Sequence, residues 1–113
     1  MEQISWQDFE KVELRVGTVI KVEDFPEARR PAYKMWIDFG TGLGVKKSSA
    51  QITKLYTKEE LIGRQVVCVV NFPPKQVANF VSECLVTGFV LETEEEVVLI
   101  QPERKVPNGL KLA

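Results

Sequence analysis

The sequence contains no histidine. Histidine is the commonest general base in enzymes and the commonest metal ligand, so its absence lowers the expectation of enzymatic chemistry. Without it, serines such as Ser48 and Ser49 could be activated as nucleophiles only by a lysine, which is a rare arrangement. We therefore expect no catalytic residue, no metal site and no cofactor.

Cysteine and long apolar segments are also scarce. Cys68 and Cys84 lie in strand-like apolar surroundings without a Cys-x-x-Cys spacing, which favours buried free thiols in a reducing compartment. No apolar run approaches the roughly 20 residues of a membrane span. The N-terminus lacks the basic and apolar regions of a signal peptide. The sequence therefore predicts a cytoplasmic protein without membrane insertion.

Charge is balanced overall but not along the chain. The 113 residues carry a formal net charge of −1, yet residues 28–80 hold nine lysines and arginines against three aspartates and glutamates. This asymmetry favours one surface for anionic partners, although long loops with solvated charge give the same pattern. A chain of this length is expected to form one domain, residues 1–113, with a core that needs no disulfides.

Two short helices carry start signals. Thr57 and Glu60 form a capping box, in which each side chain binds the other residue's amide, and Gly63 favours the left-handed conformation that ends a helix. Ser5 begins a second pattern of this kind, which predicts a helix over about residues 6–11.

Five segments have the alternation or the β-branched content of strands. In the first segment, the even-numbered residues from Val12 to Val22 are expected to face the core, and Gly17 suggests a bulge. The strands are predicted over residues 12–22, 33–39, 45–52, 65–70 and 80–91.

A short helix between the third and fourth strands of a small β-protein is the layout of an OB fold. We therefore predict an all-β protein, a five-stranded OB-fold barrel over about residues 12–91. A short N-terminal helix and a C-terminal extension flank the barrel.

Trp36 is the most informative aromatic residue. The alternation of Tyr33, Met35 and Ile37 places it on the opposite, outer face of the barrel, beside Lys34. There it can stack on a base or hold an apolar peptide side chain. Burial in a dimer interface or beneath a loop is the alternative. The third strand adds polar groups suited to a ligand face, namely Lys46, Lys47, Ser48, Ser49 and Gln51.

Three other aromatic residues have alternative explanations. Trp6 and Phe9 either close one end of the barrel or dock on a second subunit. Phe72 precedes Pro73 and Pro74, which stiffen the loop and prevent it from extending the sheet. Its ring needs a pocket, either in this subunit or in another.

Several blocks of sequence resemble a known family. Leu14–Val19, Asp38–Gly40, Ile52–Gly63 and Val106–Gly109 together resemble the tRNA-binding OB domain, which occurs free-standing and as an appendage of methionyl- and phenylalanyl-tRNA synthetases. More narrowly, Ala28–Pro31, Lys46–Ile52, Asn71–Pro74 and Ser82-Glu83 resemble the CsaA family, small homodimeric proteins described as chaperones in protein export.

The resemblance implies a homodimer built by the terminal extensions, with ligands bound on strands 2 and 3 and the loop after strand 4. The implied partners are unfolded or precursor polypeptides, with the secretion ATPase and tRNA as further candidates. The residues expected to bind peptide are Trp36, Phe72, Phe80, Lys46, Lys47 and Lys75. Those expected to bind RNA are Lys34, Lys46, Lys47, Ser49, Gln51, Asn71, Lys75 and Ser82. Those expected in the dimer interface are Trp6, Phe9, Phe72, Val106, Pro107 and Leu110.

One segment departs from the tRNA-binding members of that family, which carry a Gly-x-Glu-Ser-x-Gly-Met type run entering the fifth strand. This chain has Asn79–Leu85, which keeps Ser82 but has Val81 in place of the acidic residue. Apolar substitutions beside the ligand face fit peptide binding better. The favoured function is therefore a chaperone that binds unfolded or precursor polypeptides in protein export, and the alternative is a tRNA- or RNA-binding module.

Overall fold

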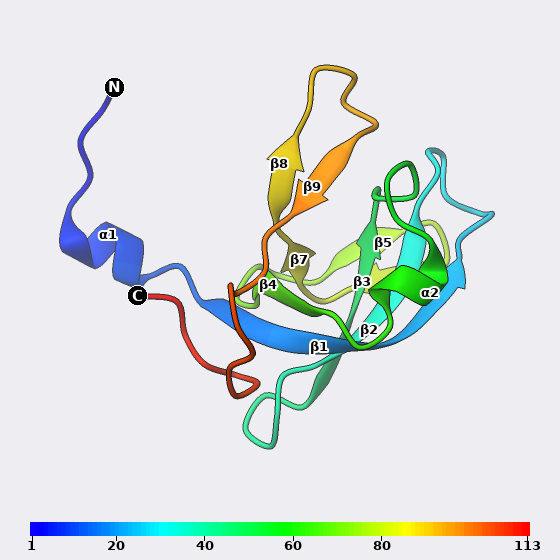
Figure 1. The fold of residues 1–113 in the computed structure, drawn as a ribbon. Helices are drawn as coiled ribbons and strands as arrows, with labels where there is room; N and C mark the ends of the chain where they lie inside the picture. The colour runs from blue at the N-terminus through cyan, green and yellow to red at the C-terminus, as the bar shows by residue number, and fades with distance from the viewer.

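A computed structural model describes all residues 1–113 and shows a nearly closed antiparallel barrel (Figure 1). Its main sheet has five strands in the order β3-β2-β1-β4-β7. The predicted all-β, OB-type fold is confirmed. The strands of this sheet are β1 (Leu14–Asp24), β2 (Tyr33–Asp38), β3 (Val45–Ala50), β4 (Gln65–Val69) and β7 (Leu85–Val86).

Two hairpins and two helices complete the fold. The hairpins are β5 (Lys75–Val77) with β6 (Phe80–Ser82) and β8 (Gly88–Val90) with β9 (Val97–Leu99), and the helices are α1 (Trp6–Glu10) and α2 (Lys58–Leu61). In Figure 1, α1 stands apart from the barrel and the β8–β9 hairpin projects from it. Neither helix has the length and apolar character that crossing a membrane requires.

Both helices begin with the predicted capping boxes. The Thr57 hydroxyl accepts a hydrogen bond from the Glu60 amide (3.2 Å), and the Glu60 carboxylate accepts one from the Thr57 amide (3.0 Å). Ser5 and Asp8 exchange the same two bonds at α1. Gly63 follows α2 with a φ of 86°, so it ends this helix as predicted.

The side chains of β1 face the core in a pattern different from the predicted one. Val19 is fully buried, and Gly17 faces the core so closely that a Cβ atom would lie 2.6 Å from Cγ2 of Ile37. Ile20, predicted to face the core, is 48% exposed. The reason is a shift in the register with β2 between Val19 and Lys21, which reverses the alternation of side chains. The predicted bulge exists, but it lies at Ile20 instead of Gly17.

The barrel closes along β3 through bonds that do not form a regular ladder. The Ser49 amide donates to Oγ of Ser82 (3.1 Å), and the Lys47 amide donates to Oε1 of Glu83 (3.0 Å). The Lys47 carbonyl accepts a hydrogen bond from the Glu83 amide (2.7 Å). We call these contacts the seam of the barrel.

The seam corrects the prediction of one continuous fifth strand over residues 80–91. The chain leaves regular strand geometry at Glu83 and Cys84 and forms β6, β7 and β8 in turn. At this break the buried hydroxyl of Ser48 donates to the Cys84 carbonyl (2.8 Å). A side chain on β3 therefore replaces the backbone partner that an unbroken strand would offer.

The two cysteines are buried free thiols, as predicted. Cys68 on β4 is fully buried, and Cys84 beside the seam is 6% exposed. A hydrogen bond with Cys84 and burial in the core raise the pKa of Cys68, so this group stays a neutral thiol at physiological pH.

The C-terminal segment continues the sheet along the part of β1 that β2 leaves free. The Val16 amide donates to the Leu110 carbonyl (3.1 Å). Beside this pairing, the Glu13 carboxylate accepts hydrogen bonds from Arg15 (2.6 Å) and from Nζ of Lys111 (3.0 Å). These bonds lower the pKa of the Glu13 carboxyl, with the Arg15 bond as the larger cause.

Glu13→Gln should lower the melting temperature at neutral pH, because the amide loses the charge that holds Arg15 and Lys111. Since the folded chain lowers the pKa of Glu13, its stabilisation is complete above the ordinary value of 4.5 and is lost as the pH falls through the lower folded-state value. Circular dichroism melts should therefore show a wild-type advantage that shrinks in acid. A constant difference down to about pH 2.5 would contradict this role. Glu92→Gln is the control, since Glu92 has no ion pair or hydrogen bond.

Candidate ligand-binding face

The outer face of β1, β2 and β3 gathers one tryptophan and three lysines. Trp36 on β2 is the register partner of Lys21 on β1 and of Lys47 on β3, while Lys34 is the partner of Ser49. Directly paired residues of neighbouring strands share a face. Trp36 is half-buried and lies outside the main core, on the predicted side. We call these five residues the outer face.

Trp36 belongs to a small aromatic cluster above the sheet. Phe80 on β6 is 7% exposed, and its ring packs edge-on against those of Trp36 and Phe25, with centroid distances of 5.9 and 5.5 Å. Ala28, Ala32 and Val77 complete the cluster. The loop after β1 and the β5–β6 hairpin therefore meet over the outer face, and Trp36 lies partly beneath the hairpin.

Lysine side chains surround these rings. Nζ of Lys21 lies 4.5 Å from the centroid of the Trp36 ring. Nζ of Lys34 lies 5.3 Å from Phe25 and 5.9 Å from Phe80, and Nζ of Lys47 lies 5.1 Å from Phe80. A cation over an aromatic ring contributes about 0.5–1 kcal/mol at exposed sites. The amines are therefore held close to an apolar surface.

This arrangement combines an apolar platform with positive charge. The half-buried Trp36 offers a ring against which an apolar side chain or a nucleobase can pack. The amines of Lys34 and Lys47 can bind a carboxylate or a phosphate at its edge. Lys21 has a carboxylate partner, since its Nζ lies 3.2 Å from Glu23. The outer face is therefore suited to ligands that present an apolar group beside an anionic one.

Lys46 and Lys47 were predicted to bind the same ligand, but Lys46 does not lie on the outer face. Its register partner is Ile37, which is fully buried in the barrel, so Lys46 projects on the opposite side of β3. The two consecutive lysines that were predicted to bind the same ligand therefore lie on different sides of β3. Lys75 lies nearby on β5, exposed and paired in register with Ser82.

Two polar residues that were predicted to bind RNA serve the fold. Asn71 holds the N-terminal segment, because its amide nitrogen donates to the Lys11 carbonyl (2.7 Å) and its oxygen accepts from the Glu13 amide (3.1 Å). Ser82 accepts the Ser49 amide in the seam. Both side chains are therefore engaged in holding the fold, and their contacts with RNA stay predictions.

The remaining predicted residues differ in how far their side chains are exposed to solvent. Phe80 is buried in the cluster and supports Trp36, so it does not offer the direct peptide contact predicted for it. Phe72 is 56% exposed, in the turn before the β5–β6 hairpin. Gln51 follows β3 and lines a polar depression with Arg30 and Lys54, beyond the outer face.

Several residues predicted for a dimer interface expose apolar surface near the two ends of the chain. Trp6 is 68% exposed, its ring centroid lies 6.3 Å from that of Phe9, and α1 buries none of its residues. Leu110 is 55% exposed. Val106 is half-buried and held by Gln65, while Pro107 is exposed.

Two residues of the site were missed from the sequence. Lys21 joins Trp36 only because of the bulge at Ile20, for which the sequence carries no clear sign. Phe25 could have been found, since a large apolar ring directly before Pro26, where a strand is expected to end, needs a covering partner. No group of three or more histidine, cysteine, aspartate or glutamate side chains is placed to hold a metal ion.

Comparison with known proteins identifies relatives of two kinds. A family model described as a putative tRNA binding domain matches residues 14–111. The methionine–tRNA ligase of Thermococcus kodakarensis is 35% identical over 114 residues, which are 99% of this chain and 14% of the ligase. That of Methanococcus aeolicus is 36% identical over 110 residues, 96% of this chain and 15% of the ligase. The chain thus spans about a seventh of these relatives.

Solved structures match the chain over its whole length. The chaperone CsaA from Bacillus anthracis is 54% identical, with a TM-score of 0.93, over 99% of this chain and 100% of that one. The CsaA chaperone protein from Picrophilus torridus is 50% identical, with a TM-score of 0.90, over 98% and 100%. A MetRS related protein from Pyrococcus horikoshii is 27% identical, with a TM-score of 0.85, over 100% of both chains.

Phe80→Ala should lower the free energy of unfolding by about 3 kcal/mol, because it leaves a cavity between Trp36 and Phe25. Phe72→Ala is the matched control and should cost under about 1 kcal/mol, since its ring is exposed. Urea unfolding followed by circular dichroism measures both. Equal losses in the two variants would contradict the supporting role of Phe80.

Proposed function

The chain belongs to the tRNA-binding domain family, and from this premise we propose that it is a chaperone that binds unfolded or precursor polypeptides on its outer face. The observation that carries the proposal is the half-buried Trp36, packed edge-on against Phe80 of the β5–β6 hairpin and surrounded by Lys21, Lys34 and Lys47. An unfolded chain presents apolar side chains interspersed with carboxylates, and this face complements both.

The relatives support a binding function. The two CsaA structures carry the description of a chaperone and match nearly the entire chain at 50% identity or more. The methionine–tRNA ligases match only over 14–15% of their length, so their catalytic activity is not carried over. We therefore propose a function by binding alone, without catalysis.

We further propose that the working form is a homodimer. Trp6 and Leu110 expose apolar side chains on the terminal segments, and the ring of Phe9 packs against that of Trp6 on the same helix. Pairing two copies through these segments would bury that surface and leave two outer faces for one client. Phe72 and the turn at Val106 and Pro107 are additional candidates for this interface.

The cellular setting follows from the resemblance to the CsaA proteins. We propose that the protein acts in the cytoplasm, on precursors destined for export, with the secretion ATPase as a candidate partner. Cys68 and Cys84 are consistent with a reducing compartment, because both are free thiols without a disulfide.

A second function, tRNA binding, is favoured by the amines of the outer face. Lys34 and Lys47 have no carboxylate partner, and Lys75 extends the same charge to the β5–β6 hairpin. Lysines placed beside a stacking ring are the usual means of holding a single-stranded segment of nucleic acid. The family model that matches the chain describes a putative tRNA binding domain.

Trp36→Ala should weaken binding of an unfolded client about 10-fold, because the buried aromatic contact at the centre of an interface carries most of its energy. The affinity is measured by fluorescence anisotropy, with a labelled client protein that is kept unfolded by reduction and carboxymethylation. Trp6→Ala is the matched tryptophan control, to be studied at concentrations where the oligomeric state is unchanged. An affinity for the client that Trp36→Ala leaves unaltered would remove Trp36 from the site.

Lys47→Glu and Lys46→Glu distinguish the two functions, because these neighbours carry the same charge on opposite sides of β3. If tRNA binds the outer face, Lys47→Glu should weaken tRNA binding about 10-fold and reduce the dependence of log K on log salt by about one. Lys46→Glu should have little effect. Binding of the polypeptide client should change less than about 3-fold in both variants. Equal losses of tRNA affinity would place tRNA elsewhere on the protein.

A further inference from the structure

A second concave site lies on the barrel, away from the outer face. It is a pocket of about 320 Å³ at the junction of β1, the turn after α2 and the segment 101–105. This volume is at the lower end of the range for small-molecule sites. None of the residues that line the pocket is hydrophobic, and three carry positive charge against one carboxylate. The lining includes Thr18, Arg64, Gln101, Glu103, Arg104 and Lys105.

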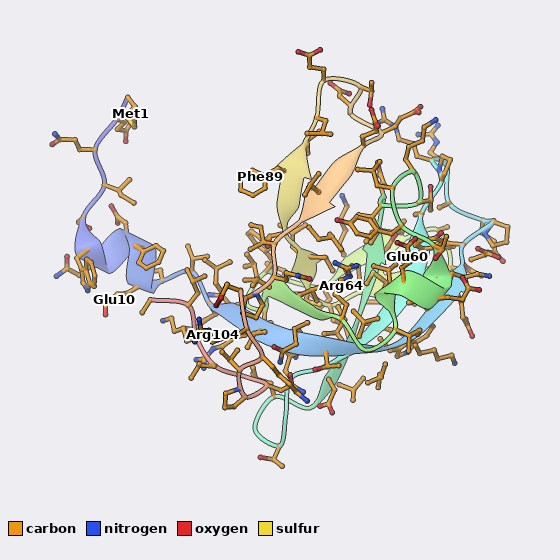
Figure 2. The ribbon with its side chains drawn as sticks, viewed as in Figure 1. Met1, Glu10, Glu60, Arg64, Phe89 and Arg104 are labelled. Carbon is orange, nitrogen blue, oxygen red and sulfur yellow. The ribbon has the colours of Figure 1, made fainter.

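Arg64 is the fixed cation of this pocket. It follows the glycine that ends α2, its amide donates to the Leu61 carbonyl (3.0 Å), and its carbonyl accepts from the Val19 amide (2.9 Å). The guanidinium lies 5.2 Å from the centroid of the Tyr56 ring, and its Nη1 donates to Gln101 (3.0 Å). Figure 2 shows Arg64 beside α2. Both backbone and side chain are thus held in place before any ligand arrives.

One donor of this guanidinium is left without an acceptor. Nε of Arg64 is buried and is the single buried side-chain nitrogen or oxygen in the chain that has no hydrogen-bond partner. An unpaired buried donor on a charged group is costly, and native structures usually supply a partner. Arg64 is half-buried, and a planar guanidinium matches the oxygens of a carboxylate or phosphate.

The segment 101–105 also carries backbone amides without a partner in the chain. The amides of Gln101, Glu103, Arg104 and Lys105 make no hydrogen bond within the chain. The side chain of Lys105 has no ion pair or hydrogen bond either. Two carboxylates near the pocket are engaged: Glu60 caps α2, and Glu103 binds Arg104 (2.6 Å). The pocket therefore has several hydrogen-bond donors and no carboxylate without a partner.

We propose that this pocket binds the phosphate group of a small phosphorylated molecule, either inorganic phosphate or a terminal phosphate monoester. Arg64 is the primary ligand, and the open backbone amides and Lys105 complete the coordination of the oxygens. A carboxylate ligand is less suited, because it offers fewer oxygens to donors that converge from two segments of chain. The site does not depend on the proposed chaperone function, since it shares no residue with the outer face.

The test is a titration of the intact protein with inorganic phosphate, followed by the amide resonances in a nitrogen–proton correlation spectrum. Sodium chloride at equal ionic strength is the reference. Amides of Arg64, Gln101 and Lys105 should shift with phosphate and saturate. Adenosine monophosphate is the second probe: tighter binding than inorganic phosphate assigns the site to a nucleotide phosphate, and equal or weaker binding assigns it to free phosphate.

Arg64→Gln should weaken phosphate binding at least about 10-fold, and Arg64→Lys about 3-fold, because lysine keeps the charge without the planar fork. Arg29→Gln, in the loop after β1, is the matched control and should leave the affinity unchanged. If Arg64→Gln fails to fold, Lys105→Gln serves instead, with a several-fold loss expected. The proposal is overturned if phosphate shifts none of the pocket amides, or if the folded Arg64 variant, or Lys105→Gln in its place, binds phosphate as tightly as the wild type.

Discussion

The seam along β3 is the contact on which the rest of the structure depends. A barrel of five strands must close its last edge, and here the side chains of Ser82 and Glu83 perform that closure together with one backbone bond from Glu83 to Lys47. Since the chain is fixed at Glu83, the β5–β6 hairpin just before it lies over the outer face. That position brings Phe80 against Trp36. The closure of the fold and the assembly of the candidate site are thus one event, and a residue of the seam, Lys47, is also a residue of the site.

The parts of the fold that could be predicted are those encoded in local sequence. The capping boxes at Ser5 and Thr57, the left-handed Gly63 and the alternation of β2 each depend on residues within one or two turns of chain, and the structure has all of them. The inner face of β1 could not be predicted in the same way. Its bulge at Ile20 is set by the register with β2, a contact between distant segments, and a shift of one residue reverses every side chain beyond it.

For the polar residues of the candidate site, the sequence could not show which side chains the fold itself engages. Sequence analysis assigns polar groups to ligands, whereas the fold uses several of them for its own unsatisfied amides. Asn71 binds the N-terminal segment, and Ser82 binds β3. Whether a hydroxyl or an amide is free depends on which backbone groups lie opposite it across the barrel. Trp36 could be placed correctly because an outward ring between lysines follows from period-two alternation alone.

The balance of charge explains how a chain with a net charge of −1 can offer two basic sites. Many of its carboxylates are engaged by the fold: Glu60 and Asp8 cap helices, Glu83 closes the seam, and Glu13 holds the C-terminal segment. Lysines at the two candidate sites, by contrast, include several without any ion pair, among them Lys34, Lys47 and Lys105. Exposed charges further apart than the Debye length, about 8–10 Å at physiological salt, interact little because the ions of the solution screen them. The local potential at each site is therefore set by these free cations, and the net charge of the chain is a poor guide to the sign of its ligands.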